Sequence, residues 1–193
     1  MKSVAVFCGS SFGNNDVFAQ HAALLGKTLA KQGRTLVYGG AKVGLMGVLA
    51  NAALDAGGTV IGVLPRFLST KEIAHTGLTE LILVNSMHER KAKMNELCDG
   101  VIAIPGGYGT MEEFFELLTW AQLGLHKKPV AILNIGGFYN GLLALADNMV
   151  GQGFLKQQDR NMLLADDNIE MLLQKMKLYV APEVNKWINK ETT

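Results

Sequence analysis

Short, almost entirely apolar runs alternate with longer segments of helical periodicity along nearly the whole chain. Such runs are typical of strands that are buried on both faces of a parallel sheet. The intervening segments place apolar residues on one helical face, as at Phe18, Ala22 and Leu25. The alternation predicts a doubly wound, Rossmann-like α/β fold with a mostly parallel sheet and helices on both faces. We expect strands at residues 4–7, 35–38, 60–64, 81–84, 101–104 and 130–133.

The chain length favours a single domain. With 193 residues, 49% of them hydrophobic and 18% charged, the chain can bury one sizeable core but is short for two. We expect one nucleotide-binding α/β domain over residues 1–181, with a final helix from Ala165 through Met171 to Tyr179 and a tail over residues 182–193. The connection at 65–79 lacks clear periodicity and could form a lid or substrate loop.

The charge pattern excludes some classes of partner. The net charge is +1, and lysine and arginine are scattered, so the chain has no basic footprint for nucleic acid or an anionic membrane. No apolar run approaches the ~20 residues of a membrane span, and the first residues begin a strand rather than a signal peptide. Cys8 and Cys98 both follow apolar stretches, as buried reduced thiols do. We therefore expect a cytoplasmic protein without nucleic-acid or membrane partners.

Glycine-containing turns follow three of the expected strands, at residues 8–11, 38–44 and 105–110. The carboxyl ends of parallel strands share one edge of the sheet, where ligands bind at the switch point. Glycine lets backbone N–H groups approach a ligand, and a following helix N-terminus suits a phosphate. These turns could serve tight chain reversal alone, but three on one edge favour a nucleotide-phosphate pocket. The candidate ligand contacts are Gly9, Ser10, Gly39, Gly40, Gly106, Gly107, Tyr108, Gly109 and Thr110.

Two familiar nucleotide signatures do not fit this chain. No G-x-G-x-x-G follows a strand, and no acidic residue ends the second strand to bind a ribose hydroxyl, so a dinucleotide is not indicated. Gly26-Lys27-Thr28 resembles the end of a P-loop, but His21 stands where the first glycine of that motif belongs. Since this segment also lies within a helical pattern, we interpret it as a helix.

Charged residues open the two helices beside the expected pocket. Thr110 and Glu113 have the spacing of a capping box, so Glu113 could either cap its helix or act on a ligand. Met87, Arg90 and Met94 share a helical face and could hold a flat base and a phosphate, or could be a solvated cation between two core methionines. The histidines lack metal-ligand spacing, so no metal site is expected.

These residues together resemble the LOG family of cytokinin riboside 5'-monophosphate phosphoribohydrolases, whose members are often mislabelled as lysine decarboxylases. The resemblance rests on Met87-His88-Glu89-Arg90-Lys91 upstream of Pro105-Gly106-Gly107-Tyr108-Gly109-Thr110-Met111-Glu112-Glu113, with further likeness at residues 8–11, 37–40, 44–47 and 119–124. The family releases the free base and ribose 5-phosphate from purine nucleoside 5'-monophosphates. The resemblance implies that Arg90 and Glu113 are the catalytic pair and that Gly107 to Thr110 hold the 5'-phosphate. It also places Lys91 and Thr119 at the nucleotide site. Met87, Met94, Met111 and Glu112 complete the candidate substrate contacts.

The resemblance further implies a homodimer that needs no metal or organic cofactor. Plant relatives carry a glutamate before the Met87 helix where this chain has Thr76, so the loop at 75–78 bears on base preference. Breaking a glycosidic bond builds positive charge on the ribose, which suits Glu113, whereas Arg90 hardly deprotonates and suits electrostatic positioning. The base remains open between adenine and an N6-substituted adenine, as does the group that protonates it.

Two alternatives to a hydrolase remain. The same pocket could belong to a non-catalytic sensor of AMP-type nucleotides. A pyridoxal-phosphate lysine decarboxylase is disfavoured because 193 residues are few for such an enzyme and no lysine lies in a recognisable Schiff-base context.

Overall fold

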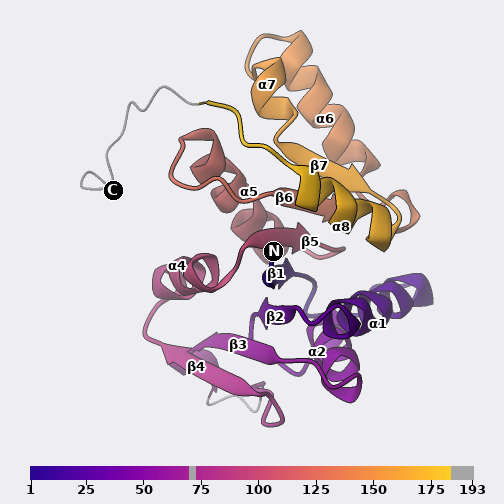
Figure 1. Ribbon diagram of the computed structural model, residues 1–193, viewed down its shortest axis with the longest axis vertical. Helices are drawn as coiled ribbons and strands as arrows, with labels where there is room; N and C mark the ends of the chain where they lie inside the picture. The colour runs from indigo at the N-terminus through magenta and orange to yellow at the C-terminus, as the bar shows by residue number, and fades with distance from the viewer. Residues whose placement is uncertain (70–72, 184–193) are drawn as a thin grey trace.

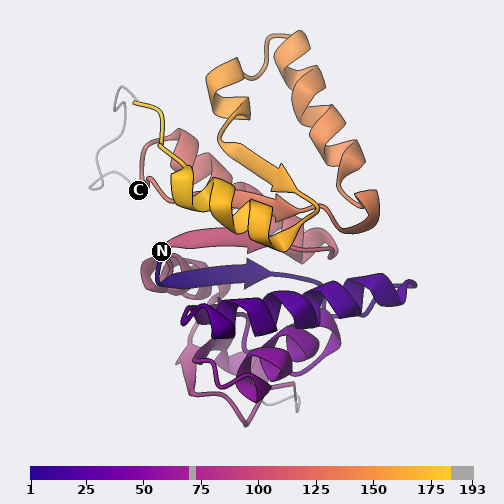
Figure 2. The same ribbon diagram turned by 45° about the vertical axis from the view of Figure 1, so that its right-hand side comes forward.

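The part of the chain that the structure describes forms a seven-stranded sheet in which every strand is parallel to its neighbours (Figures 1 and 2). The computed structural model describes residues 1–69 and 73–183. The strands are β1 (Ser3–Phe7), β2 (Thr35–Tyr38), β3 (Val60–Pro65), β4 (Glu80–Val84), β5 (Gly100–Ala103), β6 (Val130–Leu133) and β7 (Leu163–Asp166). Their order, β4-β3-β2-β1-β5-β6-β7, runs outward from β1 to β4 and returns to β5. The topological switch point therefore lies between β1 and β5, as the predicted doubly wound fold requires.

Helices cover both faces of the sheet. They are α1 (Asp16–Lys31), α2 (Gly44–Asp55), α3 (Arg66–Ser69), α4 (Met87–Leu97), α5 (Tyr108–Gln122), the 3-10 helix η1 (Ile135–Gly137), α6 (Asn140–Gly151), α7 (Gln157–Arg160) and α8 (Ile169–Leu178). Figure 1 shows α1, α2 and α8 on one side of the sheet and α4 and α5 on the other. Across residues 1–69 and 73–183, none of these helices is long and apolar enough to cross a membrane.

Alternation along the central strand divides the core into two layers. Val4 and Val6 pack with the face that carries α1, α2 and α8, whereas Ala5 and Phe7 pack with the face that carries α4 and α5. All four side chains are at most 2% exposed, which explains why the strand is apolar throughout. The sheet is therefore a rigid support for the loops at its carboxyl edge.

The predicted strands are confirmed to within one residue at each end, but the predicted final helix begins too early. Ala165 lies in β7, and the helix starts at Ile169, where the Asn168 side chain caps it by accepting a hydrogen bond from the Met171 N–H. The segment 26–28 lies inside α1, as expected, where a Cβ on Gly26 would overlap the Leu49 carbonyl oxygen.

The long connection at 65–79 begins with the end of β3 and the short helix α3, and its residues 70–72 lie outside the described part of the chain. Beyond them the chain is tied to the turn after β2, because Lys42 N–H donates to the Ile73 carbonyl and His75 N–H donates to the Gly40 carbonyl. Of the expected tail at 182–193, residues 184–193 lie outside the described part.

Candidate active site

A cavity of about 310 Å³ lies at the carboxyl edge of the sheet, beside the switch point. The turns after β1, β2 and β5 contribute to its wall, together with the first turns of α2, α4 and α5. It is lined by Val6, Phe7, Cys8, Gly9, Ser10, Gly39, Met46, Met87, Arg90, Gly107, Tyr108, Gly109, Thr110, Glu112 and Glu113. The strand order thus brings together the three glycine turns that are far apart in the sequence.

The amino end of α5 opens into this cavity without a side-chain cap. Gly107 is the N-cap residue, and no side chain accepts a hydrogen bond from the first helical N–H groups there. Uncapped donors and the positive end of the helix dipole favour an anion at this position. Gly106 keeps the preceding turn close to its neighbours, since a Cβ there would overlap the hydroxyl oxygen of Thr110.

The capping-box interpretation of Thr110 and Glu113 is wrong. Because the N-cap is Gly107, Thr110 lies within the first turn of α5, and Glu113 lies a further turn along on a buried face. The corresponding pattern occurs instead on α4, where the Ser86 hydroxyl accepts a hydrogen bond from the Glu89 N–H and the Glu89 carboxylate accepts one from the Asn85 N–H. Glu113 is therefore free to act within the cavity.

Arg90 and Glu113 form a buried ion pair across the cavity. The Arg90 Nη1 lies 2.8 Å from the Glu113 Oε1, and the two side chains are 11% and 9% exposed. Burial raises the pKa of the Glu113 carboxyl, and the charges of Glu112 and Glu116 add to the increase, while Arg90 and Lys91 oppose it. The pKa of Glu113 rises overall because the cost of burying the charged carboxylate outweighs its attraction to the Arg90 guanidinium.

Neighbouring groups hold the Arg90 guanidinium in place. Its Nε donates to the Val63 carbonyl at 3.1 Å, and its Nη1 lies 3.9 Å from the Met87 Sδ. A Cβ on Gly39 would overlap the Arg90 Nη2 and would lie 3.1 Å from the Met46 Sδ. The missing side chain of Gly39 therefore leaves room for the Arg90 guanidinium. Met46 was not among the residues predicted from the sequence.

Lys91 points away from the cavity. It is not among the lining residues, and its ammonium lies 2.5 Å from the Glu112 Oε1 and 3.0 Å from the Glu116 Oε2. The Lys91 side chain is 6% exposed, so the ammonium is buried between α4 and α5, whereas its carboxylate partners are more exposed. Glu112 itself reaches the cavity wall, with its side chain 55% exposed.

The remaining sequence-predicted residues lie outside the cavity. Met94 is fully buried in the core, and Met111 packs against the same core layer. Thr119 is exposed on α5, and Gly40 packs against the Leu64 side chain with a positive φ of 75°. Gly106 instead lines a second cavity, described next.

An apolar cavity of about 320 Å³ adjoins the first one on the side of α1 and η1. Gly9, Ser10 and Gly107 line both cavities, so the two cavities meet at the glycine turns. Its aromatic lining consists of Phe12, Phe18 and Phe138. The two cavities together combine a charged compartment with an aromatic one.

A family model and individual relatives both show the family to which the chain is similar. The model of a family described as "Possible lysine decarboxylase" matches residues 46–176. A protein of Rhodococcoides fascians named cytokinin riboside 5'-monophosphate phosphoribohydrolase is 51% identical over 170 residues, which cover 88% of this chain and 86% of that protein. A probable enzyme of the same name from Oryza sativa subsp. japonica is 48% identical over 176 residues, covering 91% and 79%.

The chain belongs to the LOG family. An Arabidopsis thaliana member is 46% identical over 178 residues, covering 92% of this chain and 78% of that protein. More distant solved structures share the LOG fold. The molybdenum cofactor binding protein of Rippkaea orientalis has a TM-score of 0.69 at 23% identity, covering 92% of this chain and 96% of that one. At that identity the likeness describes the fold alone.

Proposed function

We propose that this LOG-family chain hydrolyses the N-glycosidic bond of purine nucleoside 5'-monophosphates and releases the free base and ribose 5-phosphate. The observation that carries the proposal is a buried carboxylate, Glu113, held 2.8 Å from the Arg90 guanidinium beside the uncapped amino end of α5. The names of relatives at 46–51% identity support the same reaction.

The cavity supplies one group for each need of the reaction. The 5'-phosphate binds the N–H groups of Gly107 to Thr110, with Ser10 and Gly9 on the facing turn. This places the ribose near Glu113, whose carboxylate stabilises the positive charge that develops on the sugar and orients the attacking water. Arg90 donates hydrogen bonds and fixes Glu113, since a guanidinium does not release a proton at neutral pH.

The bond changes follow from these positions. Water oxygen forms a bond to ribose C1', the bond from C1' to the base nitrogen breaks, and its electron pair leaves with the base. The base gains a proton and the water loses one, so the products are neutral base and ribose 5-phosphate. Among the described residues that line the cavity there is no lysine, and the nearby Lys91 is held by two carboxylates, so this cavity offers no free amine for the Schiff base of a decarboxylase.

We place the base in the adjoining aromatic cavity. Its volume of about 320 Å³ and its lining by Phe12, Phe18 and Phe138 suit a flat ring that carries an apolar substituent. An N6-substituted adenine is therefore the preferred base, with adenine as the smaller substrate. The Met87 Sδ then lies beside the Arg90 guanidinium rather than against the base.

We also propose a homodimer that acts in the cytoplasm. Phe115 on α5 and Leu123, the residue that ends this helix as its C-cap, are 40% and 38% exposed, so the helix that carries Glu113 leaves apolar surface uncovered. The two cysteines, Cys8 and Cys98, are both free and buried, as in proteins of a reducing compartment.

Product chromatography over a panel of nucleotides tests the reaction. The purified protein is incubated with AMP, an AMP bearing an apolar N6 chain, GMP, CMP and adenosine. From each of the two adenine nucleotides we expect free base and ribose 5-phosphate in a one-to-one ratio. We expect little turnover of adenosine because it lacks the phosphate. Release of base from adenosine as fast as from AMP, or from none of the five compounds, contradicts the proposal.

A further inference from the structure

Lys91 is the buried cation that the proposed reaction leaves without a role. It follows Arg90 directly on α4, yet the two side chains serve different partners on α5. Arg90 pairs with Glu113 inside the cavity, whereas Lys91 reaches Glu112 and Glu116 from behind it. Neighbouring residues on a helix point about 100° apart, which separates their directions.

The charges around the cavity create a problem for an anionic substrate. Glu112 and Glu113 both line the cavity, and Arg90 is the only basic side chain among the described lining residues. Glu116 lies one turn further along the same helix. Without a second cation, these carboxylates would repel a phosphate at the amino end of α5.

Lys91 supplies that cation without entering the cavity. Its ammonium lies 2.5 Å from Glu112 and 3.0 Å from Glu116, in a cluster where the Lys91 side chain is 6% exposed. Burial lowers the pKa of Lys91, but the hydrogen bonds that its ammonium donates to Glu112 and Glu116, and the charges of these carboxylates, more than offset this, so the pKa lies above its ordinary value. Lys91 is therefore charged at neutral pH.

We infer that Lys91 is a positioning residue of the proposed hydrolase, which neutralises Glu112 and Glu116 from behind the cavity and so allows the 5'-phosphate to bind at the amino end of α5. This inference rests on the proposed function. It differs from the role that the family resemblance implies, in which Lys91 lines the nucleotide site. It also gives α5 a fixed contact with α4, which carries Arg90.

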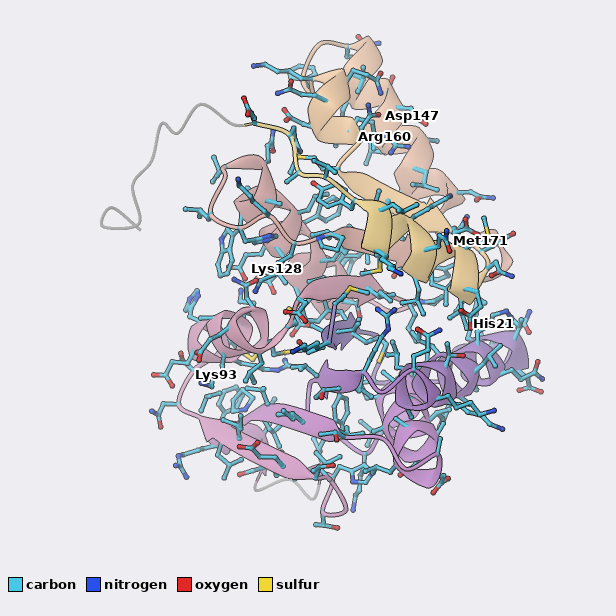
Figure 3. All side chains as sticks on the ribbon, in the orientation of Figure 1. His21, Lys93, Lys128, Asp147, Arg160 and Met171 are labelled. Atoms are coloured by element: carbon cyan, nitrogen blue, oxygen red, sulfur yellow. The ribbon has the colours of Figure 1, made fainter. Side chains whose placement is uncertain are left out.

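A pair of lysine variants on one helix tests this role. Lys91→Met removes the buried cation, and Lys93→Met is the matched control, because Lys93 is 34% exposed, pairs with Glu96 on the same helix and lies on its outer side (Figure 3). For Lys91→Met we expect the KM for AMP to rise about tenfold, with a smaller change in kcat. The ratio of its KM to that of the parent falls as salt is added, because salt screens repulsion.

Two further variants separate neutralisation from a merely structural effect. Lys91→Arg keeps the charge and is expected to restore most of the lost affinity. Glu112→Gln, added to Lys91→Met, removes one source of repulsion and is expected to lower the KM again. An unchanged KM in Lys91→Met, a loss confined to kcat, or no recovery in the double variant overturns the inference.

A binding measurement keeps this test independent of turnover. Isothermal calorimetry with ribose 5-phosphate is expected to show about tenfold weaker binding for Lys91→Met and unchanged binding for Lys93→Met. If the parent protein binds ribose 5-phosphate but releases no base from any nucleotide, the proposed function fails while the role of Lys91 is still decided by this comparison. If Lys91→Met does not fold, the single variant Glu112→Gln tests the inference instead. It is expected to bind ribose 5-phosphate more tightly than the parent protein, and equal or weaker binding overturns the inference.

Discussion

At the scale of single residues, the site depends on a carboxyl group that lies in a place that disfavours charge. Glu113 is 7% exposed, and the guanidinium of Arg90 compensates only part of the cost of burying it. A group of this kind is common where catalysis needs a poised carboxylate. Its titration gives a test that does not require a substitution in the site.

We predict that the acidic limb of the kcat/KM profile lies above pH 4.5, the ordinary pKa of a glutamate side chain. The reaction needs ionised Glu113, so the rate falls as pH drops through the folded-state pKa, which burial raises. The sign for stability is the opposite: protonated Glu113 favours the fold, and this contribution is lost as pH rises through the raised pKa. Steady-state rates with AMP between about pH 4 and 8 check this; a limb at or below 4.5 contradicts it.

Gly39 gives a second prediction at this scale. A Cβ at Gly39 would overlap the Arg90 Nη2, so Gly39→Ala is expected to displace the guanidinium and lower kcat about tenfold or more. Gly141→Ala on α6 is the control, because a Cβ there meets nothing within 4 Å. Rates are measured on folded protein, confirmed by circular dichroism. Equal rates for the two variants would refute this account of Gly39.

Sequence reasoning named Arg90 and Glu113 but not Met46, and it placed Lys91 at the substrate site, whereas the Lys91 ammonium lies against two glutamates outside the cavity. A sequence motif gives the types of residue at a site but not their contacts. The partner of a side chain depends on which helix packs against it in the folded protein. Met46 meets the site only because β2 lies beside β1 and its following turn leads into α2. Nothing in the local pattern around Met46 indicates that contact.

At the scale of elements, the amino ends of α4 and α5 are built differently. Ser86 caps α4 with its side chain, whereas α5 begins at a glycine without a side-chain cap. We predict that Ser86→Ala lowers the free energy of unfolding by about 1 kcal/mol, the usual value of such a cap. Urea denaturation measures this, with Ser69→Ala on the short helix α3 as a control for loss of an exposed hydroxyl. An unchanged midpoint for Ser86→Ala contradicts the capping role.

The turn after β1 gives a prediction about the base. Phe12 is 57% exposed and lines the aromatic cavity, so Phe12→Ala is expected to lower kcat/KM several-fold for an AMP with an apolar N6 chain and less for AMP itself. Phe154→Ala is the control, since Phe154 is 88% exposed and lies outside that cavity. Equal losses for both nucleotides would place the base elsewhere.

The elements themselves were largely predictable, with one instructive exception. Strands buried on both faces read as continuous apolar runs, which is why the runs from Val4 and Val130 were found. The edge strand β7 contributes only Leu163, Leu164 and Ala165 before an acidic residue, and it adjoins an amphipathic helix. An edge strand has fewer buried residues, so its signal merged with that of the helix.

At the scale of the whole molecule, strand order creates the site. Sequence patterns predicted a doubly wound sheet, but adjacency of β1 to both β2 and β5 comes from long-range pairing. That adjacency brings the turns of residues 8–11, 38–44 and 105–110 to one cavity. Because ligands of parallel sheets bind at the carboxyl ends of the strands, the sequence predicted the edge at which the turns meet. The pairing of the strands determines which residues of these turns face one another.

Assembly is the remaining prediction at this scale. If α5 contributes to a dimer interface, Phe115→Glu is expected to shift the protein from dimer to monomer in light scattering, because it places a charge on an apolar surface. Leu24→Glu on α1, where Leu24 is 52% exposed, is the control for a surface charge elsewhere. A monomeric parent, or a Phe115→Glu variant that stays dimeric, contradicts an interface at α5.

The central claim is that Glu113 acts on the sugar of a bound nucleoside monophosphate. The most direct test compares adenine release from AMP by the parent protein and by Glu113→Gln, with AMP binding measured on both by calorimetry. We predict that Glu113→Gln binds AMP at least as tightly as the parent but releases adenine at least about a hundredfold more slowly. Undiminished adenine release by a correctly folded Glu113→Gln would contradict the account.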